Sequence, residues 1–139
     1  WVSVPDPDDY LNFEQGWNRG TLAWERGTGA SALIHGLKAS LELLATFDAH
    51  RIANYLEGLT DYLCGRLEEK NYDVVSSRAP GEKSQIVCIR HRGGMSAMAL
   101  YAHLQSRNIV TAPRAERLRI APHLYNTSQE VDEFIKALP

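Results

Sequence analysis

The stretch RLRIAPHLYNTSQEVD, residues 117–132, carries the clearest structural signals in the chain. Its first five residues alternate, which places Leu118 and Ile120 on one side and both arginines on the other. A period of two is typical of a half-buried strand. Pro122 has no N–H to give to a sheet, so we expect the strand to end before it.

A helix is expected to begin at Thr127. Thr127 and Glu130 have the spacing of a capping box, in which each side chain accepts the other residue's backbone N–H. Apolar residues then recur at helical spacing at Val131, Phe134, Ile135 and Leu138. Arg119 would therefore lie near the end of a strand, beside free helical N–H groups that favour anions.

Arg119 allows two interpretations. A guanidinium at such a place offers two planar donors to a carboxylate. The alternative is an arginine exposed on an open sheet face and paired with a surface glutamate, an arrangement that contributes little. The strand pattern by itself leaves both open.

Residues 119–132 resemble the C-terminal signature of the class V aminotransferase family of pyridoxal-phosphate enzymes, which includes cysteine desulfurases, kynureninases and epimerase-like relatives. The family pattern is Arg-x-Ser, then Tyr-Asn-Thr and an acidic helix start; here the central triplet is Tyr125–Thr127. The resemblance implies that Arg119 binds the α-carboxylate of an amino-acid substrate. His123 resembles the histidine that one subgroup of the family has at this point of the signature. Ala121 stands where serine is usual, so its side chain offers no hydroxyl contact.

Length and charge exclude several classes of function. The 139 residues are enough for one domain with a real core. A net charge of -2 gives no electrostatic ground for a nucleic-acid or membrane partner. No apolar run approaches the ~20 residues that span a bilayer, and no signal-peptide pattern opens the chain. Because the chain begins with Trp1, we expect it to be a piece of a longer polypeptide.

The two cysteines, Cys64 and Cys88, fall within an expected helix and an expected strand. No cluster of Cys and His has the spacing that zinc requires. We interpret both as small buried hydrophobic residues rather than as a disulfide or metal pair. A reducing, cytoplasmic setting follows.

Residues 1–27 show no clean period, and two interpretations stay open: a segment that packs on a partner domain or subunit, or an ordinary irregular arm. A Gly-Thr-Gly turn then precedes a helix, where Thr28 or Ser31 can act as the cap. Such a turn also makes a natural phosphate seat. The resemblance implies that residues 1–31 are the tail of the large cofactor-binding domain, and that Thr28, with Gly27, contacts the cofactor phosphate across a homodimer.

Residues 32–139 are expected to form the small C-terminal domain. Periodicity predicts an α+β fold, a small mixed β-sheet covered on one face by helices, as in the C-terminal domain of a fold-type I pyridoxal-phosphate enzyme. The expected helices are 32–46, 48–70 and 96–105 besides the last one, and the expected strands are 72–76, 84–90 and 108–111, with a loop at 112–116 before the quoted strand.

The sequence offers no complete catalytic centre. The lysines lie on polar helix faces, at helix ends or in a turn, where none suits a Schiff base to pyridoxal phosphate: Lys38, Lys70, Lys83 and Lys136. Residues 111–118 also lack the cysteine that desulfurases carry there. We therefore expect no catalytic residue in this chain, and the isolated chain to be inactive.

The resulting hypothesis is the C-terminal domain fragment of a pyridoxal-phosphate-dependent class V aminotransferase-like enzyme. In the intact enzyme, here called the parent, Arg119 would bind the amino-acid substrate and Arg114 could assist it. The partners would be the remainder of the parent polypeptide and a second subunit. The alternative is a free-standing, non-catalytic α+β interaction or ligand-binding module.

Overall fold

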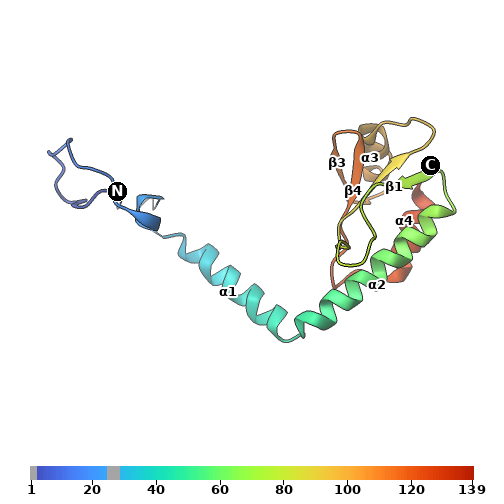
Figure 1. Cartoon of the computed structure of the whole chain (residues 1–139), viewed down its shortest axis with the longest axis horizontal. Coiled ribbons are helices and arrows are strands. Elements are labelled where there is room, and N and C mark those ends of the chain that lie inside the picture. Colours follow the sequence, from blue (N-terminus) through green and yellow to red (C-terminus); the bar gives the residue numbers. More distant parts are fainter. Residues whose placement is uncertain (1–2, 25–28) are drawn as a thin grey trace. The chain divides into compact units, whose positions relative to one another are not determined.

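The computed structural model describes residues 3–24 and 29–139, which divide into two compact units, unit 1 (1–46) and unit 2 (47–139). Unit 1 contains the short 3-10 helix η1 (Gly20–Trp24) and the helix α1 (Ser31–Ala45), both drawn in Figure 1. The domain boundary expected at residue 31 stays a prediction.

The start of α1 corrects one expectation. The N-cap is Ala30, which makes no side-chain cap hydrogen bond, and Ser31 is the first helical residue rather than the cap. Ser31 instead donates its backbone N–H to the carbonyl of Gly29 at 2.8 Å. The other predicted cap, Thr28, and its neighbour Gly27 lie outside the described residues.

Unit 2 combines three helices with one sheet, and the predicted α+β fold is confirmed. None of the helices among the described residues is both long and apolar enough to cross a membrane. In chain order the elements are α2 (Ala49–Glu68), β1 (Tyr72–Val74), β2 (Val87–His91), α3 (Ala97–Gln105), β3 (Ala112–Arg114), β4 (Arg117–Ile120) and α4 (Ser128–Ala137).

The sheet is antiparallel throughout, where a mixed sheet was expected. Its strand order is β1-β2-β4-β3, and each neighbouring pair runs antiparallel. Two of these three pairings join strands that follow one another in the chain without an intervening helix. Parallel pairing needs a crossover connection, usually a helix, so such strands pair antiparallel.

The strand expected at residues 108–111 lies further along the chain, as β3. Residues 112–116, expected as a loop, form β3 and the tight turn that leads into β4. Ala115 in this turn has φ 50°. β3 contains Pro113, but β3 is an edge strand, and a proline is tolerated there because one side of the strand needs no hydrogen bond.

The predicted helix starts in unit 2 are confirmed. The side chains of Asp48 and Ser96 cap α2 and α3 by accepting a backbone N–H at 3.0 and 3.2 Å. Thr127 and Glu130 form the expected capping box at the start of α4, with N–H to oxygen distances of 2.7 and 3.3 Å.

All three helices of unit 2 contribute to a core on one face of the sheet, with α2 and α4 running side by side (Figure 1). From the sheet, Val87, Ile89 and Leu118 enter this core with no exposed surface. The helices contribute Leu59, Leu63, Cys64, Leu67, Leu100, Leu104, Val131, Phe134 and Ile135.

Candidate functional site

The face of the sheet turned away from the helices is rich in arginine. Residues paired directly across antiparallel strands share a face, and alternate residues along a strand do so too. Arg119 pairs with Cys88 on β2 and with Ala112 on β3, while Arg117 pairs with Arg114. We name this surface the arginine face and define it by Asp73, Cys88, Arg90, Ala112, Arg114, Arg117 and Arg119.

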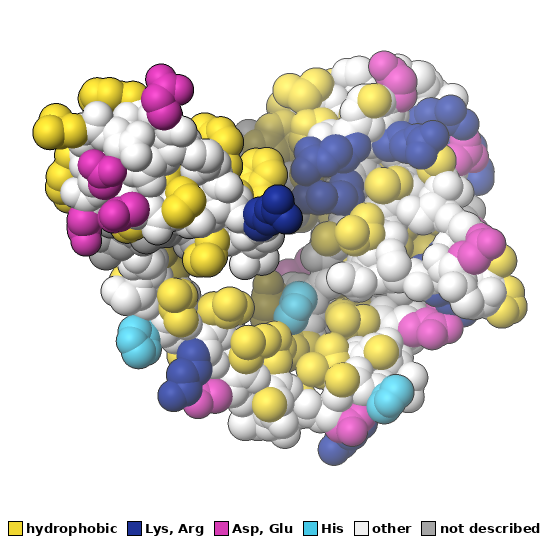
Figure 2. Space-filling model, turned by 60° about the vertical axis from the view of Figure 1, so that its left-hand side comes forward, with side chains coloured by type: hydrophobic (Ala, Val, Ile, Leu, Met, Phe, Trp, Pro, Cys, Tyr) yellow, Lys and Arg dark blue, Asp and Glu magenta, His cyan; other side chains and the backbone are white. Residues whose placement is uncertain are grey.

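No side chain of the arginine face is buried. Figure 2 shows basic side chains gathered in the upper right of the view. The predicted alternation of β4 is thereby confirmed, because Leu118 enters the core and the arginines on either side of it do not.

Arg119 lies one residue before the end of β4 and is partly exposed. Within the part of the chain that the structure describes, its guanidinium forms no ion pair and no hydrogen bond. The surface glutamate of the alternative interpretation is therefore not found among the described residues. Its cross-strand neighbours Cys88 and Ala112 are both short, so neither reaches as far from the sheet as the guanidinium.

The arginines on the arginine face and just beside it fall into two groups, those with a carboxylate partner and those without one. Arg92, just beyond β2, donates to the carboxylate of Asp73 at 2.8 Å, and Arg90 approaches the same carboxylate at 3.6 Å. The hydrogen bond from Arg92, followed by the charges of both arginines, lowers the pKa of Asp73. Arg114 is exposed, and among the described residues its side chain donates to the carbonyl of Pro113 alone, at 2.8 Å. Within the described part of the chain, no acidic side chain compensates the positive charge on the β3 and β4 side.

A groove of about 690 Å³ lies elsewhere in unit 2, along α4 and the segments 107–111 and 120–127. Neither Arg119 nor Arg114 lines it. Two of its polar side chains are engaged locally, because Glu130 belongs to the capping box and Asn126 accepts the backbone N–H of His123 at 2.9 Å. The buried hydroxyl of Thr111 has no hydrogen-bond partner among the described residues. The groove thus lacks the row of arginines that the arginine face offers to a carboxylate.

The motif residues between β4 and α4 stabilise the connection between these two elements. The rings of His123 and Tyr125 stack with centroids 5.0 Å apart, and the hydroxyl of Tyr55 donates to the carbonyl of Asn126 at 2.6 Å. These contacts fix the connection that follows Arg119. The sequence revealed this motif but not the ring stack or the hydrogen bond from α2. That hydrogen bond joins residues that lie far apart in the chain, so no local pattern indicates it.

The lysines of the chain do not fit pyridoxal phosphate. A Schiff base needs an uncharged lysine amine that faces the cofactor. The ammonium of Lys83 lies 2.8 Å from Asp61 and 3.1 Å from Glu57, and these hydrogen bonds raise its pKa and keep it protonated. Lys38 pairs with Glu42, and no lysine lines the groove or belongs to the arginine face.

Both cysteines are free. Cys64 is buried in the core, and desolvation raises the pKa of its thiol, as expected for a structural residue. Cys88, which was expected to be buried, is instead partly exposed, because it lies on the arginine face beside Arg119. No group of three potential metal ligands occurs among residues 3–24 and 29–139.

The small α+β domain has an arginine near the end of an inner strand, followed by a helix with a capping box. The family model "Aminotransferase class-V" covers residues 9–134, and the chain belongs to this family. It is similar to "Uncharacterized aminotransferase YcbU" of Bacillus subtilis (strain 168), with 24% identity over 119 residues. That match covers 86% of this chain and 31% of the relative, so the chain spans about a third of the curated relative's length.

Proposed function

We propose that this chain is the C-terminal part of a pyridoxal-phosphate-dependent, aminotransferase-like enzyme that acts on an amino acid, and that Arg119 binds the substrate's α-carboxylate. The observation that carries the proposal is the state of Arg119. It stands near the end of β4 on the uncovered face, with no acidic partner among the described residues, and the motif around it resembles the family's signature.

The chemistry of the guanidinium supports this role. Its planar donors match the two oxygens of a carboxylate, and charge-assisted pairs of this kind are about twice as strong as neutral hydrogen bonds. Holding the carboxylate fixes the orientation of the substrate's Cα bonds, which is how a binding group lowers a reaction barrier. Arg114, on the neighbouring strand, adds positive charge to the same face.

The remainder of the parent would supply the Schiff-base lysine and most of the cofactor site. Pyridoxal phosphate provides the electron sink for the reaction. Gly27 and Thr28 would contact its phosphate from the neighbouring subunit of a homodimer. Unit 1 supports such partners because none of its described residues is buried, including the apolar residues of α1. The free cysteines support a reducing, cytoplasmic compartment.

Steady-state kinetics of the full-length enzyme with Arg119→Lys tests the proposal. Lysine keeps the charge but loses the bidentate geometry, so kcat/KM should fall between about ten- and a hundredfold. Arg90→Lys is the matched control, because Arg90 lies on the same face but has Asp73 as its partner.

The two variants separate a specific role from a general one. An unchanged kcat/KM in Arg119→Lys would contradict the proposal. An equal loss in both variants would mean that the face needs positive charge in general rather than a clamp at residue 119.

A further inference from the structure

Arg114, Arg117 and Arg119 form a continuous row of positive charge on the arginine face. Arg117 pairs directly with Arg114 across β4 and β3, and Arg119 follows Arg117 on the same side of the strand. Like charges placed directly opposite one another destabilise a sheet. Sheet formation alone therefore gives no reason for this arrangement.

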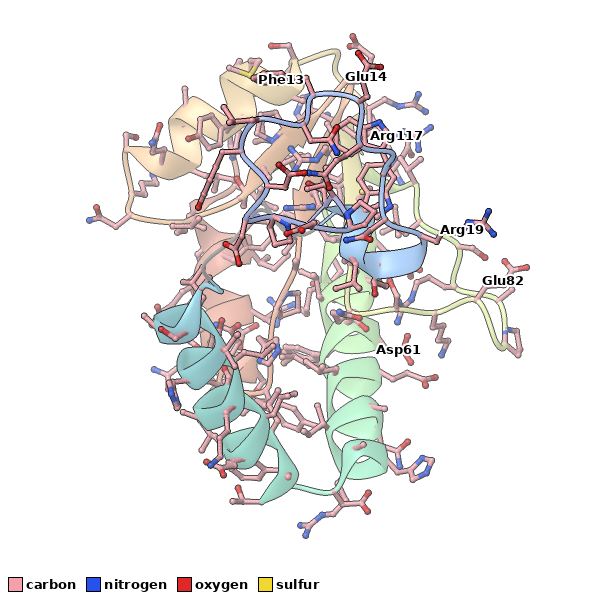
Figure 3. All side chains as sticks on the ribbon, turned by 90° about the vertical axis from the view of Figure 1, so that its left-hand side faces the viewer. Phe13, Glu14, Arg19, Asp61, Glu82 and Arg117 are labelled. Carbon is pink, nitrogen blue, oxygen red and sulfur yellow. The ribbon has the colours of Figure 1, made fainter. Side chains whose placement is uncertain are left out.

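The described part of the chain does not compensate these charges. Glu116, in the turn between Arg114 and Arg117, forms no ion pair with either of them. Asp73 is already engaged by Arg90 and Arg92 toward the β1 edge of the sheet. Figure 3 labels Arg117 in the upper part of the molecule. A bound anion would remove the repulsion between the two opposed arginines.

The row has two parts with a defined spacing. Alternate residues of a strand lie ~7 Å apart, so the base of Arg117 is one such step from that of Arg119. Directly opposed residues lie ~5 Å apart, so Arg114 and Arg117 can place both guanidinium groups on one anion. Because arginine side chains are long, their ends can converge on two carboxylates held by a short carbon chain.

We propose that Arg114 and Arg117 form a second anion subsite beside Arg119, and that the substrate is an amino acid with an acidic side chain, that is, a dicarboxylic amino acid. Arg119 takes the α-carboxylate, and the opposed pair takes the side-chain carboxylate. This inference rests on the proposed function and deepens it. A substrate with an apolar side chain would leave the repulsion between Arg114 and Arg117 in place.

The test measures selectivity in the full-length enzyme. The ratio of kcat/KM for L-glutamate or L-aspartate to kcat/KM for L-alanine is compared in the wild type, Arg117→Gln, Arg114→Gln and Arg119→Gln. We expect the wild type to favour a dicarboxylic substrate, and Arg117→Gln and Arg114→Gln each to lower the ratio about tenfold or more. Arg119→Gln should lower kcat/KM for every substrate.

Arg90→Gln is the control, because it removes an arginine of the same face that already has a carboxylate partner; it should keep the wild-type ratio. A wild type that favours L-alanine, or an Arg117→Gln ratio equal to that of the wild type, would overturn the second subsite. An Arg119→Gln enzyme with unchanged kcat/KM would overturn the proposed function instead, so the two failures are distinguishable.

A measurement on the 139-residue chain needs no turnover. NMR signals of the arginine side-chain Nε–H groups are followed while glutarate, a dicarboxylate, or butyrate, a monocarboxylate of similar size, is added. We expect glutarate to shift the signals of Arg114, Arg117 and Arg119 together at concentrations where butyrate does not. Equal shifts with both ligands, or shifts confined to Arg119, would overturn the subsite.

Discussion

At the scale of single residues, partners decide what a cation can do. Lys83 and Arg78 both bind Asp61 on α2, and Arg78 also donates to Thr60 at 2.9 Å. These bonds tie the loop between β1 and β2 to the helix; Figure 3 labels Asp61 on α2 and Glu82 on that loop. Arg119 has no such partner in the described chain and stays available to a ligand.

Asp61 makes the stability of unit 2 depend on pH. Hydrogen bonds from Lys83 and then from Arg78 lower its pKa below the ordinary value. A pKa that is lower in the folded than in the unfolded state stabilises the fold above the unfolded value, and that stabilisation is lost as the pH falls through the folded value. Because Asp61 is 45% exposed, solvent screening limits its contribution to about 1 kcal/mol.

Denaturant unfolding of Asp61→Asn checks this linkage. The variant should have a lower free energy of unfolding than the wild type at pH 7, and the difference should shrink and vanish as the pH falls through the lowered pKa of Asp61 in the folded state. Glu133→Gln is the control, since Glu133 has no ion pair within the described residues. A difference that does not change with pH would show that the ion pairs are not its cause.

For single residues, the sequence predicted the face of a strand on which a side chain lies better than it predicted the partner on the adjacent strand. The alternation of residues 117–121 placed Arg119 and Arg117 together, away from Leu118, and the structure agrees. The neighbours Cys88 and Arg114 could not be predicted, because strand pairing depends on the three-dimensional register rather than on local pattern.

At the scale of elements, local hydrogen bonds fixed the helix starts that were predicted correctly. The capping box of α4 is closed by a bond of 3.3 Å from the N–H of Glu130 to Thr127 and by one of 2.7 Å in return. Capping signals are encoded within four residues, which is why the sequence reveals them. The edge strand β3 was misplaced because its proline is acceptable only in a position that the whole sheet defines.

Thr127→Ala measures how much the capping box contributes. We expect the free energy of unfolding to fall by about 1 kcal/mol, because the N–H of Glu130 loses its acceptor. Ser128→Ala, one residue later, removes a hydroxyl that caps nothing and should change it by less than about 0.5 kcal/mol. Equal losses in the two variants, measured by denaturant unfolding, would contradict the assigned cap.

At the scale of the whole molecule, the two units differ in what they can bury alone. Unit 2 has a core shared by its sheet and its three helices. Unit 1 exposes apolar residues around much of α1, including Leu33, Ile34, Leu37, Leu41 and Leu43. A helix that is apolar around most of its circumference is usually buried in a larger protein, which agrees with a chain that spans 31% of its aminotransferase relative.

The proposed division of work between this chain and the rest of a longer enzyme could be predicted only in part. The family signature and the absence of a suitable lysine are properties of the sequence. The ion pairs that hold Lys83 protonated, and the lack of an acidic partner for Arg119, depend on which residues the fold brings together.

The most direct measurement of the central claim compares an amino-acid substrate with its carboxamide, which lacks the α-carboxylate charge, as ligands of the full-length enzyme. We predict that the wild type binds the amino acid at least tenfold more tightly than the amide, and that Arg119→Gln abolishes this preference while Arg90→Gln keeps it. An Arg119→Gln enzyme that still prefers the carboxylate by the wild-type factor would contradict the account.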